Sequence, residues 1–344
     1  MVKTWILGVN PMLLSRMKIK KRDLIILSYV LSTIIFVIVY LTGGTRKVYT
    51  NLMYIPISII SSTTGIKRAV IHAIYSGLLV GPVMPMNVEA GIRQDFFNWF
   101  IRLVIYIIIA TVIGFFADYY RKEFEINKRK EEELADAQYS VIYSLVKLAE
   151  SRDDNTGAHI ERVALFSKII AEKLREIPKY KGYINDSYIE NIYKAAPLHD
   201  IGKVGIPDRI LLKPSKLNEE EYEIMKTHAV IGANTLKEVI RKYPDNRLLE
   251  MGISITNYHH EWWDGTGYPE GLKGTDIPLS ARIMAVADVY DALRSKRVYK
   301  EAYTHEEAVT IIKEGRGTQF DPDIVDVLLE NQDEFDYVFK NTVV

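Results

Sequence analysis

The charged residues of this chain are very unevenly distributed along its 344 positions. Up to Phe116 there are twelve Lys or Arg and three Asp or Glu, whereas the remaining residues include 32 basic and 41 acidic ones. A formal net charge of zero thus conceals a basic, apolar front and an acidic back. A long apolar front with so few charges has to be buried, so we expect a membrane region followed by a soluble region. The length agrees with this, because it suits about two domains.

Four apolar segments fill the front, and they differ in strength. Leu24–Leu41 and Phe97–Phe116 each approach the ~20 apolar residues that a membrane-spanning helix needs. Val48–Ile60 and Ala69–Val83 are shorter and interrupted, and alone they would also suit re-entrant or buried core segments. With only two spans, about fifty mostly apolar residues would lie outside the membrane. We therefore predict a helical membrane region at residues 1–117 with four spanning helices.

Lys and Arg flank the outer spans, and they predict the orientation because basic residues accumulate in short cytoplasmic loops. The flanking residues are Lys18, Lys20, Lys21 and Arg22 before the first span, and Arg121, Lys122, Lys128, Arg129 and Lys130 after the last. Lys67 and Arg68 fall in the loop that four spans place inside, whereas Arg46 and Lys47 would face outward. The apolar run is too long for a removed signal peptide. We expect a multi-pass protein of the inner (cytoplasmic) membrane, with both termini and the soluble region in the cytoplasm.

A segment rich in Lys, Glu, Ala and Leu, without Gly or Pro, follows the membrane region. Residues 118–143 are therefore predicted to form one long coupling helix. Its loose apolar stripe, which includes Leu134, Val141, Leu145 and Leu148, leaves two interpretations open. The helix is either one strand of a parallel coiled coil in a homodimer or a plain charged linker.

Residues 144–344 show helical patterns separated by short stretches with Gly, Pro or Asp, and they lack runs of alternating β-branched residues. The expected helices are Ala158–Glu176, Asp186–His199, Asn218–Arg241, Leu248–His260, Leu279–Leu293, His305–Lys313 and Asp321–Asn331. We predict an all-α fold class, with a bundle whose site residues project inward from several helices.

Histidines and aspartates gather at the ends of these helical patterns. The chain has seven histidines, and five of them belong to this group. The group comprises His159, His199-Asp200, His228, His259-His260 and Asp288. A single histidine on an apolar face is usually a packed core residue, but so many together with carboxylates indicate a metal site. These ligands suit iron, manganese, zinc or nickel, and a thiolate site is excluded because the chain has no cysteine.

These residues lie in ordered motifs. From about Ser144 to Val327 the chain resembles the HD-GYP group of HD-domain metal-dependent phosphohydrolases, which act on the bacterial second messenger cyclic di-GMP. The matching motifs are Arg152-Asp153…Thr156-Gly157…His159…Arg162-Val163, then His199-Asp200-Ile201-Gly202-Lys203, then Met225-Lys226…His228, then His259-His260-Glu261…Gly267-Tyr268-Pro269, then Ala287-Asp288-Val289-Tyr290-Asp291. The resemblance implies hydrolysis of cyclic di-GMP to pGpG, and it leaves open whether GMP is the final product.

The resemblance also implies a centre of two divalent metal ions, iron or manganese. Its implied ligands are His159, His199, Asp200, His228, His259, His260 and Asp288, with Asp200 bridging the two ions. One departure bears on the number of ions. Members that hold three metals usually carry glutamate where this chain has Asn155, and an asparagine oxygen is a weaker ligand. We therefore predict two ions.

Two further residues have implied catalytic roles, and each has a structural alternative. Lys203 would contact phosphate or assist the leaving group, but it also suits a surface position at a helix C-terminus, where cations are favoured. Asp153 would orient a ligand or the nucleophilic water, but it equally suits a helix-end acid that pairs with Arg162.

The resemblance implies substrate contacts from two further segments. Tyr268, in a loop made tight by Gly and Pro, would present its ring and hydroxyl to a ligand. Arg297 and Lys300 match positions that contact phosphate and guanine, and arginine suits both because its planar fork can hydrogen-bond or stack. The alternative for this basic pair is an exposed turn.

Two other functions remain open. The chain is alternatively an HD hydrolase for another cyclic dinucleotide or nucleotide, or a nucleotide-binding receptor with little turnover. The complete set of metal-binding side chains argues against a receptor, which has no need of them. Nucleic acid is not an expected partner, because the soluble part is acidic overall.

Overall fold

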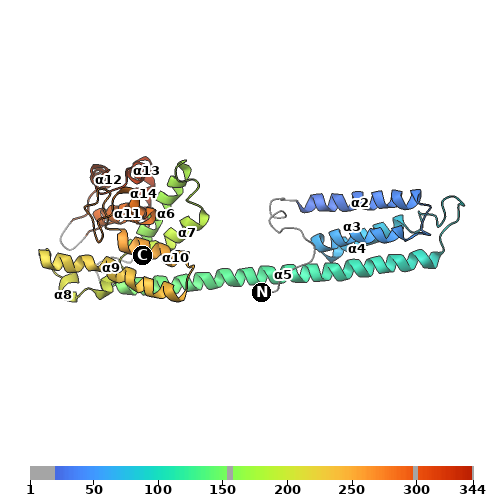
Figure 1. Cartoon of the computed structure of the whole chain (residues 1–344), viewed down its shortest axis with the longest axis horizontal. Coiled ribbons are helices and arrows are strands. Elements are labelled where there is room, and N and C mark those ends of the chain that lie inside the picture. The colour runs from blue at the N-terminus through green and yellow to red at the C-terminus, as the bar shows by residue number, and fades with distance from the viewer. Residues whose placement is uncertain (1–19, 153–157, 297–300, 343–344) are drawn as a thin grey trace. The chain divides into compact units, whose positions relative to one another are not determined.

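A computed structural model describes residues 20–152, 158–296 and 301–342 of the chain (Figure 1). In these residues every regular element is helical, and the only β-structure consists of two isolated bridges. The predicted all-α fold class is thereby confirmed. The chain divides into two compact units, Met1–Leu134 and Ala135–Val344.

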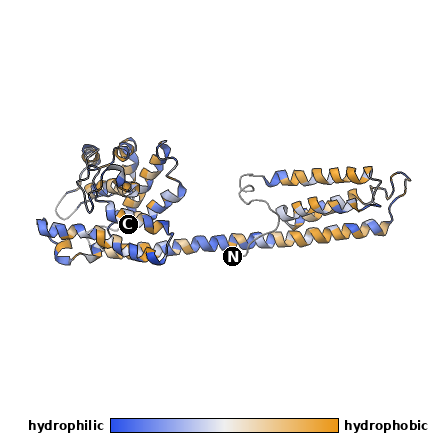
Figure 2. Cartoon of the chain, in the orientation of Figure 1, coloured by the Kyte–Doolittle hydropathy of each residue, from blue (hydrophilic) through white to orange (hydrophobic). Residues whose placement is uncertain are grey.

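The first unit is built from apolar helices. They are α2 (Lys21–Leu41), η1 (Val48–Met53), α3 (Tyr54–Thr64), α4 (Ile66–Leu79) and the N-terminal part of α5 (Phe96–Glu150). Figure 2 shows the predominance of apolar residues in α2 and in the first part of α5. Val39, Ile57 and Tyr106 are fully buried between the helices, whereas Ile71 and Ile108 are exposed. The unit is thus apolar outside as well as inside.

Two of these helices, α2 and α5, are long and apolar enough to cross a membrane. The other two, α3 and α4, have 11 and 14 residues, fewer than the ~20 that span the hydrocarbon core. Gly65, with a φ of +82°, separates them, and a Cβ there would lie 2.5 Å from the Asp118 carboxylate. Asp118 in turn accepts a hydrogen bond from the Ile66 N–H at the start of α4. The four helices predicted for residues 1–117 are present, but four membrane spans are not confirmed.

The predicted coupling segment, residues 118–143, is helical throughout and forms part of α5. Near the end of α5, Val146 is buried against Leu198 in the second unit. Leu134, Val141 and Leu148, which belong to the predicted apolar stripe, are 60%, 60% and 69% exposed. The stripe therefore lies on a different face of α5 from Val146.

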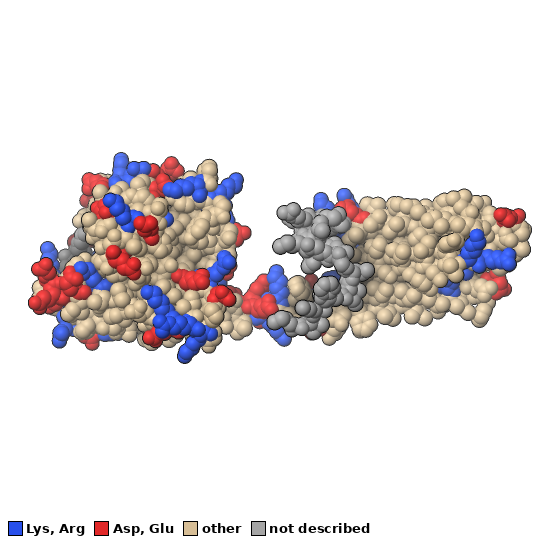
Figure 3. Space-filling model, viewed as in Figure 1, with Lys and Arg blue, Asp and Glu red and all other residues tan. Residues whose placement is uncertain are grey.

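The second unit combines the C-terminal part of α5 with a bundle of shorter helices that follow it. They are α6 (Ala158–Glu176), α7 (Asp186–Ala195), η2 (Ala196–Leu198), η3 (Ile201–Gly205), α8 (Asp208–Leu211), α9 (Glu219–Lys242), α10 (Arg247–Tyr258), η4 (Gly274–Asp276), α11 (Leu279–Arg294), α12 (His305–Glu314), α13 (Pro322–Glu330) and α14 (Gln332–Asn341). Polar side chains fix several helix starts, since Asn218 and Thr304 form capping boxes at α9 and α12. Charged side chains of both signs are spread over this unit (Figure 3).

The main core of the second unit includes α6, α11 and the C-terminal helices. The Phe166 ring on α6 stacks on Phe335 of α14 with 5.0 Å between ring centroids, and it meets Tyr290 of α11 edge-on at 5.1 Å. Such aromatic contacts add to the free energy gained by burying the rings. This packing holds α6 against α11, so that His159 Nε2 lies 3.8 Å from Asp288 Oδ1.

Candidate metal centre

A proline ends the helix that leads to the first predicted ligand pair. The sequence predicts one helix over Asp186–His199, but α7 ends at Ala195. Pro197 has no N–H, and its ring would clash with the carbonyl four residues earlier, so an α-helix does not continue through it. The chain forms the 3-10 turn η2 instead. His199 and Asp200 follow this turn, 0% and 7% exposed.

Close contact between η3 and α9 places Asp200 beside His228. A Cβ on Gly202 would lie 1.9 Å from the His228 carbonyl oxygen and 2.6 Å from the Gly232 nitrogen. Only glycine allows two backbones to approach so closely. As a result, His228 Nε2 lies 3.2 Å from Asp200 Oδ1.

Three histidines are oriented by the backbone of their own segments. Each Nδ1 lies close to a carbonyl oxygen three or four residues earlier, at 3.0 Å for His199 and His259 and 2.7 Å for His228. Because a carbonyl oxygen only accepts, Nδ1 carries the hydrogen, and a neutral ring then has its lone pair on Nε2. The three Nε2 atoms face Asp200, at 3.2 Å for His199 and His228 and 3.8 Å for His259.

His159 comes from the first turn of α6 and is oriented by a carboxylate. Its Nδ1 donates to Asp291 Oδ2 at 2.7 Å, and Asp291 also accepts two hydrogen bonds from Arg162, at 2.5 and 2.9 Å. His159 Nε2 and His199 Nε2 both lie 3.8 Å from Asp288 Oδ1. Asp291 is not among the predicted site residues, although it follows Asp288 by one helical turn.

The ligand atoms form two groups, each with its members within 4.8 Å of one another. One group comprises Asp200, His228, His259 and His260, and the other comprises Glu150, His159 and His199. Asp200 lies between the groups, because Oδ1 faces His228 while Oδ2 faces His199. The structure therefore brings together the histidines and aspartates predicted as metal ligands, and it adds Glu150, which was not predicted.

Several of these atoms are buried and have no hydrogen-bond partner among the described residues. They are both carboxylate oxygens of Glu150, Oδ1 of Asp200, and Nε2 of His199, His228 and His259. An unpaired buried polar group costs about 1–3 kcal/mol, and a charged one more. Two ligands that each lie about 2.0–2.2 Å from one ion are about 2.8–3.6 Å apart. The 3.2 Å separations around Asp200 agree with this spacing, so the residues fit bound metal ions.

Neighbouring charges set the protonation of the centre. Burial lowers the pKa of His199, but the adjacent Asp200 carboxylate outweighs burial and raises that pKa to about 9. Burial lowers the pKa of His259 to about 4 and the pKa of His260 well below its usual range. Burial opposes ionisation of Asp200, yet Lys203, with its Nζ 2.7 Å away, and His199 hold the pKa of that carboxyl well below its usual value. An ionised carboxylate thus faces imidazoles that bind metal when neutral.

The loop after the histidine pair is held by a buried carboxylate. Glu261 accepts hydrogen bonds from the backbone N–H groups of residues 270, 271 and 272, at 2.7, 3.1 and 2.9 Å. A Cβ on Gly267 would lie 2.2 Å from the Trp262 nitrogen, so this position also requires glycine. The Tyr268 ring stacks on His260 with 4.8 Å between ring centroids. The loop therefore carries Tyr268 to the edge of the ligand cluster.

Some of the predicted site residues lie outside the described residues. They are Asp153, Arg297 and Lys300, together with Asn155. The catalytic role of Asp153 and the substrate contacts of Arg297 and Lys300 stay predictions.

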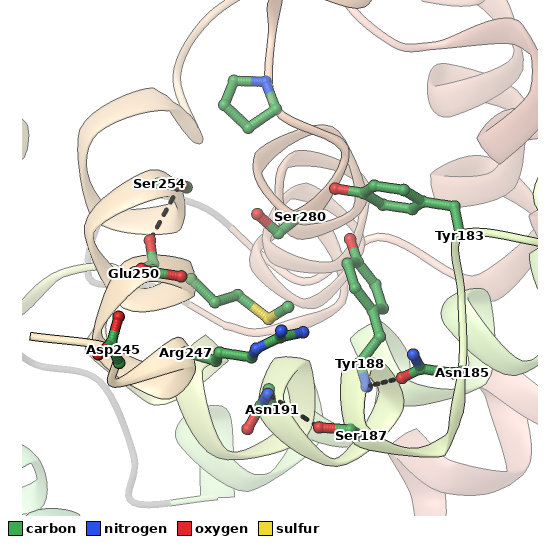
Figure 4. A pocket seen from close by; sticks show the side chains of 12 residues that line it. Tyr183, Asn185, Ser187, Tyr188, Asn191, Asp245, Arg247, Glu250, Ser254 and Ser280 are labelled. Atoms are coloured by element: carbon green, nitrogen blue, oxygen red, sulfur yellow. Dashed lines mark hydrogen bonds between the residues drawn. The ribbon is translucent and has the colours of Figure 1, made fainter. Parts of the chain in front are cut away.

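A separate pocket lies between α7, α10 and the start of α11 (Figure 4). It has a volume of about 640 Å³, and Tyr188, Arg247 and Glu250 are among the residues that line it. None of the described ligand residues lines this pocket, so it is distinct from the metal centre.

Comparison with known proteins agrees with this geometry. The HD domain family matches residues 146–324, which is more than half of the chain. The chain belongs to the HD domain family.

Three curated proteins of Vibrio cholerae are similar to this chain. A "Probable cyclic di-GMP phosphodiesterase" is 48% identical over 208 residues, which cover 60% of this chain and 47% of that protein. A "Cyclic di-GMP phosphodiesterase" is 52% identical over 194 residues, 56% of this chain and 39% of that protein. A "3'3'-cGAMP-specific phosphodiesterase 2" is 41% identical over 203 residues, 59% of this chain and 36% of that protein. The chain spans less than half the length of these relatives.

Proposed function

We propose that this chain is a metal-dependent phosphodiesterase that hydrolyses cyclic di-GMP to pGpG. The observation that carries the proposal is the buried cluster of imidazole and carboxylate atoms around Asp200, several of which lack hydrogen-bond partners among the described residues. Such a cluster is costly in a protein that only binds a nucleotide, and it suits one that holds cations. The names of two relatives, at 48% and 52% identity, support cyclic di-GMP as the substrate.

The proposed centre holds two divalent ions, iron or manganese, in adjoining positions. The first position comprises Asp200, His228, His259 and His260, and the second comprises His159, His199, Asp288 and the other oxygen of Asp200. Divalent ions at such a site lower the pKa of a water nucleophile and neutralise charge on phosphate oxygens. The 3.2 Å distances from the two Asp200 oxygens to different histidines support its bridging role.

Residues of the chain would position the phosphate and the bases. Lys203 is held by its ion pair with Asp200, so its Nζ lies beside the proposed ions, where a departing ribose oxygen would need a positive charge or a proton. Tyr268, stacked on His260, would border the bound dinucleotide. Arg297 and Lys300 are proposed to contact its phosphates and guanines, and Asp153 is proposed to orient the nucleophilic water.

A second candidate substrate is 3'3'-cGAMP, because a relative at 41% identity carries that substrate in its name. Both substrates offer the same phosphodiester linkage, so the metal centre does not separate them. The residues proposed to contact the bases would separate the two substrates, and among these Arg297 is the one whose planar fork suits a guanine edge.

We also propose that the first unit anchors the protein in the inner membrane, with the second unit in the cytoplasm. The apolar windows of α2 and α5 support this, since only 22% and 17% of their residues are buried within the unit. Leu134, Val141 and Leu148 recur every seven residues on an exposed face of α5, which suits a parallel coiled coil with a second copy.

The proposed activity is tested by incubating the Mn²⁺-loaded chain in detergent with cyclic di-GMP or 3'3'-cGAMP, followed by chromatography of the products. We expect pGpG from cyclic di-GMP, slower turnover of the mixed dinucleotide, and loss of both activities in His199→Ala. His305→Asn is a matched control, because His305 binds the Tyr290 hydroxyl and is not in the ligand cluster. Faster turnover of 3'3'-cGAMP would favour the second candidate, and no turnover of either would refute the activity.

A further inference from the structure

Glu150, the last residue of α5, is a buried acid in the second unit. Glu150 is 5% exposed, and neither of its carboxylate oxygens has a hydrogen-bond partner among the described residues. A buried carboxylate in this state is costly unless a cation or a donor is bound to it. One of its carboxylate oxygens lies within 4.8 Å of the ligand nitrogens of His159 and His199.

The packing of α5 explains why this glutamate points inward. Val146 is buried against Leu198 and Leu236, and Ile142 and Tyr143 pack beside it. Glu150 follows Val146 by four positions and so lies on the same face of the helix. Leu148, on another face, is 69% exposed. The inward face of α5 thus ends in a carboxylate directed at the second group of ligand atoms.

The charge of the proposed centre gives this carboxylate a role. Two divalent ions bring four positive charges, whereas the ligands predicted from the sequence include only two carboxylates, Asp200 and Asp288. A third carboxylate beside His159 and His199 reduces this excess of positive charge in a buried site.

We propose that Glu150 is a ligand of the second metal position, where it adds a third carboxylate beside His159 and His199. The proposal rests on the metal centre of the proposed function, but not on its substrate. It makes the last residue of α5 part of the centre, so a displacement of this helix end would move a metal ligand.

The first test is Mn²⁺ binding to the full chain in detergent, after removal of metal, by titration calorimetry and electron paramagnetic resonance. The comparison is between the unaltered chain, Glu150→Gln and the matched control Glu176→Gln, which removes the same charge from an exposed position near the end of α6. We expect two Mn²⁺ per chain, with the affinity for one lowered at least about tenfold in Glu150→Gln and both unchanged in the control. Equal binding by Glu150→Gln and the unaltered chain would overturn the proposal.

Thermal unfolding of Glu150→Met gives a second readout that a merely structural glutamate would not produce. Removing the unpartnered carboxylate should raise the unfolding temperature of the metal-free chain, while the further rise caused by Mn²⁺ should shrink. A Mn²⁺-induced rise as large as that of the unaltered chain would contradict metal ligation by Glu150. Because neither test uses cyclic di-GMP, weaker Mn²⁺ binding in Glu150→Gln without turnover by the unaltered chain would refute the proposed activity and leave this inference standing.

Discussion

Asp291 organises the side of the metal centre that His159 occupies, and replacing it with asparagine should weaken both folding and metal binding. The Asp291 side chain is fully buried and accepts hydrogen bonds from His159 Nδ1 and from Arg162 Nε and Nη2. Asp291→Asn keeps the shape but removes the charge. Arg162, only 6% exposed, would then be a buried cation without a counter-ion among the described residues.

The size of the effect follows from burial. Removing one partner of a buried ion pair costs about 3–5 kcal/mol, because the other charge stays buried. For a unit of roughly 200 residues, each kcal/mol lowers the unfolding temperature by about 2–4 °C, so a decrease of about 6–20 °C is expected. His159 would also lose the carboxylate that fixes its tautomer, and losses of this kind cost about 10- to 100-fold in metal affinity.

Asp326→Asn is a matched control, because Asp326 accepts two hydrogen bonds from Arg316 in a similar fork. Both of these side chains are nearly half exposed, so this pair should contribute no more than about 1 kcal/mol. The assays are thermal unfolding of the metal-free chain and Mn²⁺ titration. Equal unfolding temperatures for the two variants, or an unchanged Mn²⁺ affinity in Asp291→Asn, would refute this account of Asp291.

The contribution of Asp291 to folding stability has a defined pH dependence. Burial opposes the charge of Asp291, but the hydrogen bonds from His159 and Arg162 outweigh it and lower the pKa of this carboxyl below its usual value. A carboxylate with a depressed pKa stabilises the fold fully above its unfolded pKa of about 3.9. The stability difference between the unaltered chain and Asp291→Asn should therefore be constant from neutral pH to about pH 4–5 and disappear only as the pH falls through the folded pKa.

Three further outcomes follow from the same geometry. Asp200 raises the pKa of His199 to about 9, so Mn²⁺ must displace a proton from His199 at lower pH. The Mn²⁺ affinity should therefore rise about tenfold per pH unit up to pH 9 and level off above it. An affinity independent of pH between 7 and 9 would contradict this. Gly202→Ala should destabilise the second unit by at least about 1–3 kcal/mol and weaken Mn²⁺ binding, since the new Cβ would overlap the His228 carbonyl oxygen. Calorimetric unfolding with and without Mn²⁺ measures the stability and the Mn²⁺ binding of this variant against the unaltered chain. Lys203→Met should retain two Mn²⁺ per chain while kcat for cyclic di-GMP falls about 10²-fold or more, and a simultaneous loss of metal would assign Lys203 to the support of Asp200 instead.

The helices of the second unit could be predicted from the sequence because local signals mark them. Asn218 and Thr304 form capping boxes at the starts of α9 and α12, and both helices begin within one residue of the expected position. The prediction of one helix over Asp186–His199 was wrong at its C-terminal end, because Pro197 ends α7 at Ala195. The turn that follows directs His199 and Asp200 into the site. The helix bounds were thus predicted correctly where capping residues near in the sequence set them.

The carboxylates around the predicted ligands were harder to recognise. Glu150 is one acidic residue among many in a charged helix, and only its position four residues after the buried Val146 distinguishes it. Asp291 belongs to a quoted motif, but its partners His159 and Arg162 are more than 120 positions away in the sequence. Spacing along the chain does not reveal such pairings, because they arise from the packing of α6 against α11.

The expectation of four spans shows a different limit. Apolar composition identified the two short segments that became α3 and α4 and the interruption between them, and these helices have 11 and 14 residues, fewer than the ~20 a membrane span needs. The backbone at Gly65 has a positive φ, and the adjacent Asp118 caps the next helix, so the break depends on a contact with α5.

The most direct test of the central claim combines metal analysis with product analysis on one preparation. The full chain is purified anaerobically in detergent, its iron and manganese are quantified per chain, and its products from cyclic di-GMP are separated by chromatography. We predict two ions per chain and conversion to pGpG, with both lost in His199→Ala. Two bound ions with cyclic di-GMP left intact would contradict the proposed phosphodiesterase activity.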